Sequence, residues 1–121
     1  MDASREEFEE MVADALDGLP EELGRHMDNV VVMVEDWPSA EQLQGVRGTL
    51  LGLYQGVALT NRTPLNYSGA MPDRIFIFRG TICERSPTAE ALVNLVRRTV
   101  IHEVAHHFGI SDARLHELGW A

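Results

Sequence analysis

The chain has 121 residues, a length that fits one compact domain over residues 1–121 and can bury a core without disulfides. Its 10 basic and 19 acidic side chains give a formal charge of −9, which repels phosphate backbones and disfavours general nucleic-acid binding. The longest strongly apolar run, residues 30–34, is far shorter than the roughly 20 residues of a membrane-spanning helix, so we expect no membrane insertion. A single cysteine, Cys83, and an N-terminus without the features of a secretory signal favour a cytoplasmic protein.

The first half of the chain predicts two helices followed by two strands. Ser4 and Glu7 form a capping-box pattern at the start of an amphipathic helix, and residues 20–23 favour a second, short helix. The unbroken β-branched run over residues 29–35 predicts a strand covered on both faces, that is, an interior strand. Residues 50–57 predict a second strand with a bend or bulge at its glycines.

The second half predicts a loop, a third strand and two more helices. Residues 60–73 are polar and rich in turn formers, and loops of about fourteen residues are often functional. Residues 74–79 predict a strand. A long helical pattern then begins with Pro87 at its first helical position, ends at Gly109, and is followed by a short terminal helix over residues 113–118. These elements together indicate an α+β fold.

The last turns of the long helix contain the pattern H-E-x-x-H. His102 and His106 are four residues apart, so their side chains point the same way and can reach one metal ion. Glu103 projects about 100° away from His102 around the helix, which places it beside the metal rather than on it. From there it can accept a proton from a metal-bound water. The pattern therefore supplies two metal ligands and a base for hydrolysis.

A hydrolytic metal site of this type needs a third protein ligand. Gly109 can adopt the left-handed conformation and turn the chain so that Asp112 returns to the metal. Asp112 can also begin the short terminal helix, and the two roles are compatible. His116 and Glu117 are alternative ligands if the chain after Gly109 follows another course. Two neutral imidazoles and one carboxylate around a divalent cation leave a net charge of +1, enough to acidify water and polarise a carbonyl.

The setting of the motif strengthens this interpretation, since H-E-x-x-H occurs by chance in on the order of one in a few hundred chains of this size. Here it lies near the buried end of a predicted helix that follows several strands. The neighbouring His107 projects away from His106 and is better explained as a structural histidine beneath the site. Cys83 is expected to be a buried, inert thiol, and His26 a surface residue.

The stretch from His102 to Asp112 resembles the zincins, and its form H-E-x-x-H-x-x-G-x-x-D is similar to the branch whose third zinc ligand is aspartate. Residues 51–56, 72–80 and 96–112 together are similar to the small bacterial zincin-like metallopeptidase family. This resemblance covers most of the chain. It implies a minimal zincin-like fold with an N-terminal helix, a small mixed sheet of three or four strands, and a C-terminal active-site helix followed by a short terminal helix.

The resemblance also implies an activity and a set of site residues. One Zn²⁺ ion would be held by His102, His106 and Asp112, with Glu103 as the general base. The chain would be a zinc-dependent metallopeptidase that hydrolyses a peptide or protein substrate. Only nine residues follow Asp112 and none is methionine, so we expect no Met-turn and no lower lobe of a cleft. We therefore expect activity that is weak, broad or dependent on an unidentified protein partner.

Substrate binding in zincins uses an edge strand beside the active-site helix, where main-chain hydrogen bonds hold an extended peptide. Residues 74–79 and residues 50–55 are the two candidates for this strand. A donor to the developing oxyanion would also help peptide hydrolysis. The candidate donors, each better explained as structural or surface residues, are Tyr54, Tyr67, Arg74 and His116.

Three other functions fit parts of the pattern. A zinc-binding module without catalysis would need no substrate cleft. A metal-dependent ribonuclease also uses helical histidines, but the charge of −9 and the carboxylate at the position of Asp112 disfavour it. A non-haem iron oxygenase uses two histidines and a carboxylate, whereas Glu103 inside the motif favours hydrolysis.

Overall fold

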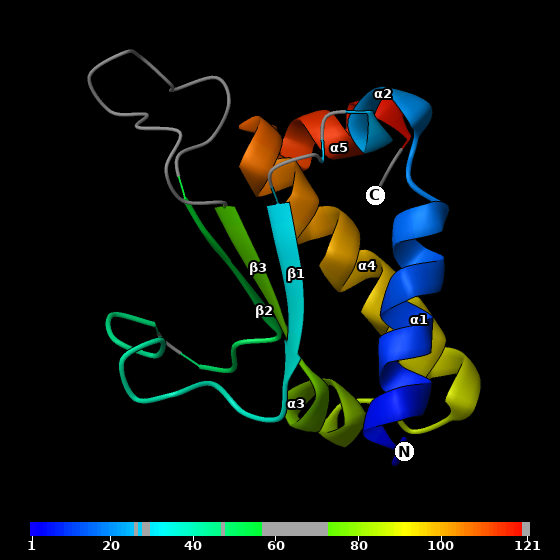
Figure 1. Cartoon of the computed structure of the whole chain (residues 1–121), viewed down its shortest axis with the longest axis vertical. Coiled ribbons are helices and arrows are strands. Elements are labelled where there is room, and N and C mark those ends of the chain that lie inside the picture. Colours follow the sequence, from blue (N-terminus) through cyan, green and yellow to red (C-terminus); the bar gives the residue numbers. More distant parts are fainter. Residues whose placement is uncertain (26, 28–29, 47, 57–72, 120–121) are drawn as a thin grey trace.

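The computed structural model describes residues 1–25, 27, 30–46, 48–56 and 73–119, and Figure 1 shows how their helices and strands are arranged. In chain order the elements are α1 (Arg5–Asp17), α2 (Glu21–Gly24), β1 (Val30–Glu35), β2 (Gly52–Gln55), β3 (Asp73–Phe78), α3 (Arg79–Glu84), α4 (Ala89–Phe108) and α5 (Asp112–Leu118). The α+β fold and the mixed sheet of the sequence analysis are confirmed.

The three described strands form one sheet in the order β1-β3-β2. β3 lies in the centre, where it pairs in parallel with β1 and antiparallel with β2. The register places Val34 opposite Ile77 on one side and Gly52 opposite Ile77 on the other. Helices α1 and α4 lie together on one side of this sheet (Figure 1), so the domain has two layers.

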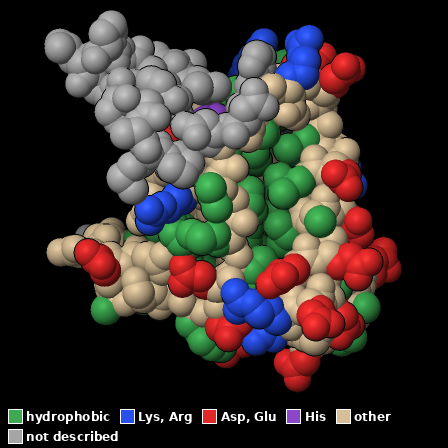
Figure 2. Space-filling view, viewed as in Figure 1, with side chains coloured by type: hydrophobic (Ala, Val, Ile, Leu, Met, Phe, Trp, Pro, Cys, Tyr) green, Lys and Arg blue, Asp and Glu red, His purple; other side chains and the backbone are tan. Residues whose placement is uncertain are grey.

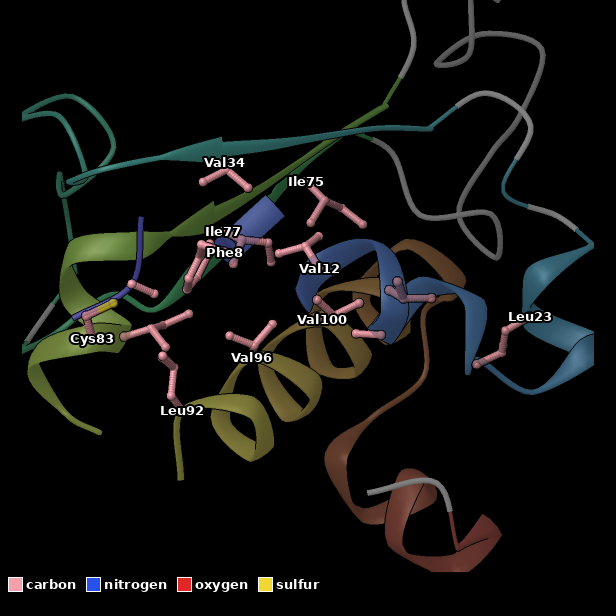
Figure 3. Packing of buried hydrophobic residues seen from close by; sticks show 14 residues of the cluster. Phe8, Val12, Leu23, Val34, Ile75, Ile77, Cys83, Leu92, Val96 and Val100 are labelled. Atoms are coloured by element: carbon pink, nitrogen blue, oxygen red, sulfur yellow. The ribbon is translucent and has the colours of Figure 1, made fainter. Parts of the chain in front are cut away.

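The core lies between the sheet and these two helices, as Figure 3 shows. β3 alternates across the sheet, so that Ile75 and Ile77 point toward the helices and are fully buried. Phe8 of α1 and Val100 of α4 meet them from the helical layer, also without exposure. Burial of such apolar side chains contributes about 25 cal/mol per Å², and it fixes α4 against the sheet along its length.

Several local predictions are confirmed. Ser4 and Glu7 form the expected capping box at the start of α1: the backbone N–H of Glu7 donates to Ser4 Oγ at 3.1 Å, and the backbone N–H of Ser4 donates to Glu7 Oε1 at 3.3 Å. The long helix ends at Gly109, which takes the left-handed conformation with φ of 71°. Both short helices, α2 and α5, are also present. Each of these features depends on contacts within a few residues of the chain.

The predicted interior position of residues 29–35 is wrong. β1 pairs only with β3 among the described strands and therefore forms an edge of the sheet. Its alternate side chain Val31, on the face away from the helices, is 41% exposed. The β-branched run expresses strand propensity, which does not distinguish an edge strand from a central one.

The interior strand is instead β3, whose side chains other than half-buried Arg74 are all buried. The predicted end of this strand at Arg79 is corrected, because Arg79 begins the helix α3, which the sequence analysis did not predict. This helix has six residues, too few to show a helical period. Gly80 allows the start of the helix to pack under Trp37, since a Cβ at this position would lie 2.5 Å from Trp37 Cε2.

Two boundaries also differ from the prediction. α4 begins at Ala89, with Thr88 as the N-cap, so Pro87 precedes the helix rather than occupying its first turn. The hydroxyl of Thr88 accepts a hydrogen bond from the backbone N–H of Ala91 at 3.1 Å, which gives the helix its start. Of the predicted loop over residues 60–73, only Asp73 lies within the described residues, and it is the first residue of β3.

The surface seen in Figure 2 combines an apolar strip with acidic margins. The strip lies in a groove between β1 and α1 and is lined by Val12, Leu16, Val32 and Val34. Acidic side chains gather on the α1 side of this view. None of the described helices has both the length and the apolar character needed to cross a bilayer.

Strand β2 approaches α4 unusually closely at Gly52. A Cβ on this glycine would lie 2.9 Å from Thr99 Cγ2 and 3.0 Å from Glu103 Cγ. The oxygen of Phe76 would be only 3.2 Å away on the strand side. Glycine at position 52 therefore sets how near the strand can come to the helix.

We predict that Gly52→Ala lowers the free energy of unfolding by about 1–3 kcal/mol, because the added methyl group must displace packed atoms on both sides. Urea denaturation followed by circular dichroism measures the change. Gly24→Ala is the matched control, since nothing lies within 4 Å of its Cβ position, and it should change stability by less than about 1 kcal/mol. Equal stability of Gly52→Ala and wild type would contradict this account of the contact.

Candidate metal centre

The last turns of α4 bring His102 and His106 together on one face. Their ring centroids lie 4.4 Å apart with an angle of 63° between the ring planes, as expected for residues one helical turn apart. The two side chains are 41% and 45% exposed, so both rings can be reached from solvent. The pair is thus open on one side and supported by the helix on the other.

Glu103 lies next to this pair but is buried, with only 5% of its surface exposed. Its Oε1 is 3.2 Å from Nδ1 of His106. His102, Glu103 and His106 each offer a possible ligand atom, and these atoms all lie within 4.8 Å of one another. The structure therefore brings together all three residues of the H-E-x-x-H motif.

The packing of β2 against α4 determines the electrostatics of Glu103. Burial raises the pKa of its carboxyl to about 7; a hydrogen bond from the backbone N–H of Tyr54 opposes this shift, and the negative charge of Asp112 adds to it. A carboxyl with this pKa exchanges its proton near neutral pH. This property suits a general base better than the pKa of an ordinary exposed glutamate.

His106 is favoured in its neutral form. Burial and the neighbouring His102 lower the pKa of its imidazole, while the charge of Asp112 acts in the opposite direction. A neutral imidazole has a free electron pair on one ring nitrogen, which is the form that binds a metal ion. The surroundings of His106 thus favour the neutral form of its imidazole, which can bind a metal ion.

Asp112 reaches the motif by the turn that the sequence analysis expected. Gly109 ends α4 in the left-handed conformation, Ser111 caps α5, and Asp112 is the first residue of that helix. Its Oδ1 lies 2.9 Å from Nδ1 of His102, and its side chain is 68% exposed. Asp112 is therefore next to the histidine pair, although it is not one of the three residues in the tight cluster.

These residues fit a divalent metal ion such as zinc. Imidazole nitrogens and carboxylate oxygens are ligands that Zn²⁺ accepts, and catalytic zinc sites use three protein ligands and leave one position open. His102, His106 and Asp112 provide two such nitrogens and one such carboxylate, and His102 contacts both the ring of His106 and the carboxylate of Asp112. The open side of the histidine pair leaves room for a further ligand.

A second group of polar side chains, in which His107 and Asp73 are buried and Tyr54 is partly buried, lies beneath the motif. His107 is 2% exposed, and its Nδ1 lies 2.8 Å from Oδ2 of Asp73. The hydroxyl of Tyr54 donates to the same oxygen at 2.7 Å. No described residue forms a hydrogen bond with His107 Nε2, so the polar contact of this ring among the described residues is the one between Nδ1 and Asp73. The expectation of a structural histidine at position 107 is confirmed.

The sequence analysis missed the role of Asp73. It treated this residue as the boundary of a strand, whereas Asp73 is a buried first residue of β3 that anchors α4 through His107. The sequence could have indicated this role. Side chains two residues apart in a strand face the same side of the sheet, so Asp73 faces the helices together with Ile75 and Ile77. A carboxylate on the buried face of a strand requires a partner, and His107 is one.

The face that carries the histidine pair opens into a groove of about 1000 Å³ between the start of β2, α4 and α5. β2 forms the second edge of the sheet among the described strands, while β3 is central. Residues 74–79 therefore cannot be the edge strand, and residues 50–55 are the remaining candidate. The groove is lined by residues of the segment before and within β2, of α4 and of the last helix, among them Leu51, Gly52, Arg98, His102, Glu103 and His116.

The structure does not place the other residues that the sequence analysis named at the histidine pair. The Tyr54 hydroxyl is engaged by Asp73, away from the histidine pair. Arg74 alternates with Asp73 and so points to the face of the sheet opposite α4. Glu117 pairs with Arg114 at 2.9 Å on the surface of α5. Cys83 is buried and free, as expected. Tyr67 and His26 lie outside the described residues.

Comparison with known proteins agrees with this geometry. A model of the zincin-like metallopeptidase family matches residues 27–120, and the chain belongs to this family. A solved structure described as a conserved hypothetical protein from Thermo thermophilus has the same fold, with a TM-score of 0.61 and 23% sequence identity. The match covers 88% of this chain and 94% of the other. No curated protein matches the sequence.

We predict that Glu103→Gln makes the metal-free protein more stable above neutral pH. The folded-state pKa of Glu103, about 7, exceeds that of an unfolded glutamate, so wild-type stability falls as pH rises from about 4.5 to 7. Glutamine removes this cost, which amounts to about 3 kcal/mol at pH 8 and disappears below about pH 4.5. Urea denaturation of chelator-treated wild type and variant at pH 4.5 and pH 8 measures the difference. A stability difference that does not change with pH would contradict the buried ionisation.

Proposed function

We propose that this protein is a zinc-dependent metallopeptidase whose active site is built by His102, Glu103, His106 and Asp112. The observation that supports this most is the position of Glu103, buried by β2 yet 3.2 Å from His106 at the open groove. A purely structural zinc site would not need a carboxyl of raised pKa beside its ligands.

The metal ligands in this proposal are His102, His106 and Asp112. When bound, a zinc ion would supply Lewis acidity, which polarises the peptide carbonyl and lowers the pKa of water. The helix holds the two imidazoles one turn apart, and the Gly109 turn holds the carboxylate against His102. Asp112 stands next to His102 but outside the tight cluster, so its exposed carboxylate would turn toward the histidine pair to complete the set.

Glu103 acts as the proton carrier. Its carboxylate accepts a proton from the attacking water and returns it to the nitrogen of the leaving amine, so that one residue serves as base and then as acid. The backbone N–H of Tyr54 holds the carboxyl in place, and Gly52 permits the strand to bury it.

The substrate in this proposal is an extended peptide that lies along β2. An extended segment can add to a free sheet edge through main-chain hydrogen bonds, which give affinity with little dependence on sequence. The start of β2 is adjacent to Glu103, and Gly52 with the preceding residues 49–51 forms one wall of the groove. A peptide on this edge would pass directly over the histidine pair.

The setting of the activity is also part of the proposal. The exposure of His102 and His106, 41% and 45%, supports a shallow cleft and an activity that is weak, broad or dependent on a protein partner. The buried free thiol of Cys83 is compatible with a reducing, bacterial cytoplasm. We expect no nucleic-acid ligand, because the overall charge is −9.

The test combines metal analysis with cleavage of an unbiased peptide library by the full chain. We expect the zinc-loaded wild type to cleave peptides and Glu103→Gln to lose activity by at least about a hundredfold while keeping its zinc, since the variant lacks only the proton carrier. Glu117→Gln, the same change on the exposed surface of α5, should keep both zinc and activity. Absence of zinc from wild type, or undiminished cleavage by Glu103→Gln, would contradict the proposal. Stoichiometric zinc without any cleavage would indicate a binding module instead.

The assignment of Asp112 as third ligand has its own test. We expect Asp112→Ala to weaken zinc binding by at least about tenfold in a competition titration with a chromophoric chelator, because one anionic ligand is lost. Glu117→Ala, on the same helix, should leave the affinity unchanged. A larger loss for Glu117→Ala or His116→Ala than for Asp112→Ala would transfer the role to that residue.

A further inference from the structure

We infer that the groove beside the metal centre selects substrates that carry a carboxylate, which Arg97 and Arg98 of α4 bind. The inference rests on the proposed function, because it names the chemical class of substrate for the same site. Three observations carry it: the position of the two arginines on the helix, their lack of acidic partners among the described residues, and the charge of the remaining groove wall.

The first observation is geometric. Arg98 precedes His102 by four residues, so its side chain continues the row formed by His102 and His106 one turn further toward the start of α4. Arg97 stands beside it. Both arginines are exposed and both line the same groove as His102 and Glu103. A ligand lying along the groove from the metal centre toward the start of the helix therefore meets these guanidinium groups.

The second observation concerns partners. Among the described arginines, three are paired with acids: Arg5 with Glu9, Arg79 with Asp36 and Arg114 with Glu117. The others form no ion pair with a described acid, and of these only Arg97 and Arg98 line the groove. Arg97 and Arg98 form no such pair with any described residue. Unpaired guanidinium groups retain their full capacity to bind an anion.

The third observation is the contrast with the rest of the molecule. The chain carries a formal charge of −9, yet the only acidic residues among the described ones that line the groove are Glu103 and Asp112, which belong to the metal centre. The part of the groove wall that Arg97 and Arg98 form is therefore a positively charged region on an acidic protein. Such a positive region attracts the anionic part of a substrate.

The spacing indicates where the carboxylate lies on the substrate. One helical turn separates His102 from Arg98 and rises about 5.4 Å, while an extended peptide rises about 3.4 Å per residue. The bound carboxylate therefore lies about two residues from the scissile bond. Arginine presents a planar fork that matches a carboxylate in a bidentate way. Either an Asp or Glu side chain or the C-terminal carboxylate of a short peptide provides this group.

The test measures binding and cleavage separately with matched peptides. Fluorescein-labelled octapeptides of alanine and glycine carry one glutamate or one glutamine at successive positions, and a parallel set has a C-terminal acid or amide. Binding is measured by fluorescence anisotropy to the zinc-loaded full chain with the Glu103→Gln change, so that the peptides stay intact. We expect the best carboxylate peptide to bind about three to ten times more tightly than its neutral counterpart, with a preference that weakens as salt is raised.

Variants assign this preference to the two arginines. Arg98→Gln and Arg97→Gln/Arg98→Gln should reduce the ratio of the two affinities toward one, whereas Arg98→Lys should retain part of it because the charge remains. Arg25→Gln is the matched control, since Arg25 is exposed, lies outside the groove lining, and its loss changes the net charge as much as that of Arg98. Thermal unfolding of each variant checks that the fold is retained.

The outcomes separate this inference from the proposed function. Cleavage by wild type without any preference for a carboxylate peptide, or a preference that survives Arg97→Gln/Arg98→Gln, would overturn the inference and leave the peptidase intact. A preference that depends on the arginines, with no cleavage of any peptide by wild type, would support the carboxylate site while contradicting the peptidase. Comparison of the glutamate series with the acid and amide series identifies which carboxylate is bound.

Discussion

The close contact between β2 and α4 is the constraint on which the rest of the site depends. Gly52 has no side chain, so the strand can lie against Thr99 and Glu103 without displacing either. This contact buries the Glu103 carboxyl, raises its pKa and brings the backbone N–H of Tyr54 to it. β2 lies at an edge of the sheet among the described strands, and its first residue, Gly52, forms a wall of the groove together with residues 49–51. The absence of a side chain at Gly52 therefore allows the strand packing that buries Glu103.

Helix α4 packs into the core through one face and carries the histidine pair on its C-terminal turns. Its apolar face, which includes Val96 and Val100, packs into the core and holds the helix rigidly on the sheet. Its C-terminal turns carry the histidine pair, and the buried contact between His107 and Asp73 fixes these turns to β3. A site in which two imidazoles must stay about one turn apart benefits from such an anchor, since small displacements of the ligands weaken a metal site.

The distribution of charge separates the groove from the rest of the surface. Acidic side chains dominate the composition and gather on the α1 side of the molecule in Figure 2, where they favour solubility rather than recognition. Along the groove the exposed cations Arg97 and Arg98 stand without acidic partners among the described residues, beside an expected metal cation. The net charge thus argues against nucleic-acid binding by the protein as a whole while permitting anion recognition at one place.

The sequence by itself determined the features that depend on local chemistry: the capping box at Ser4, the end of α4 at Gly109, the H-E-x-x-H motif on that helix and the family. It did not determine which strand was central, because the β-branched run of β1 and the shorter apolar run of β3 have similar propensities. Nor did it reveal the contact between Asp73 and His107, which are 34 residues apart, or the burial of Glu103 by Gly52. Only the tertiary structure decided these, because strand order and burial arise from contacts between segments distant in the chain, about which local patterns carry no information.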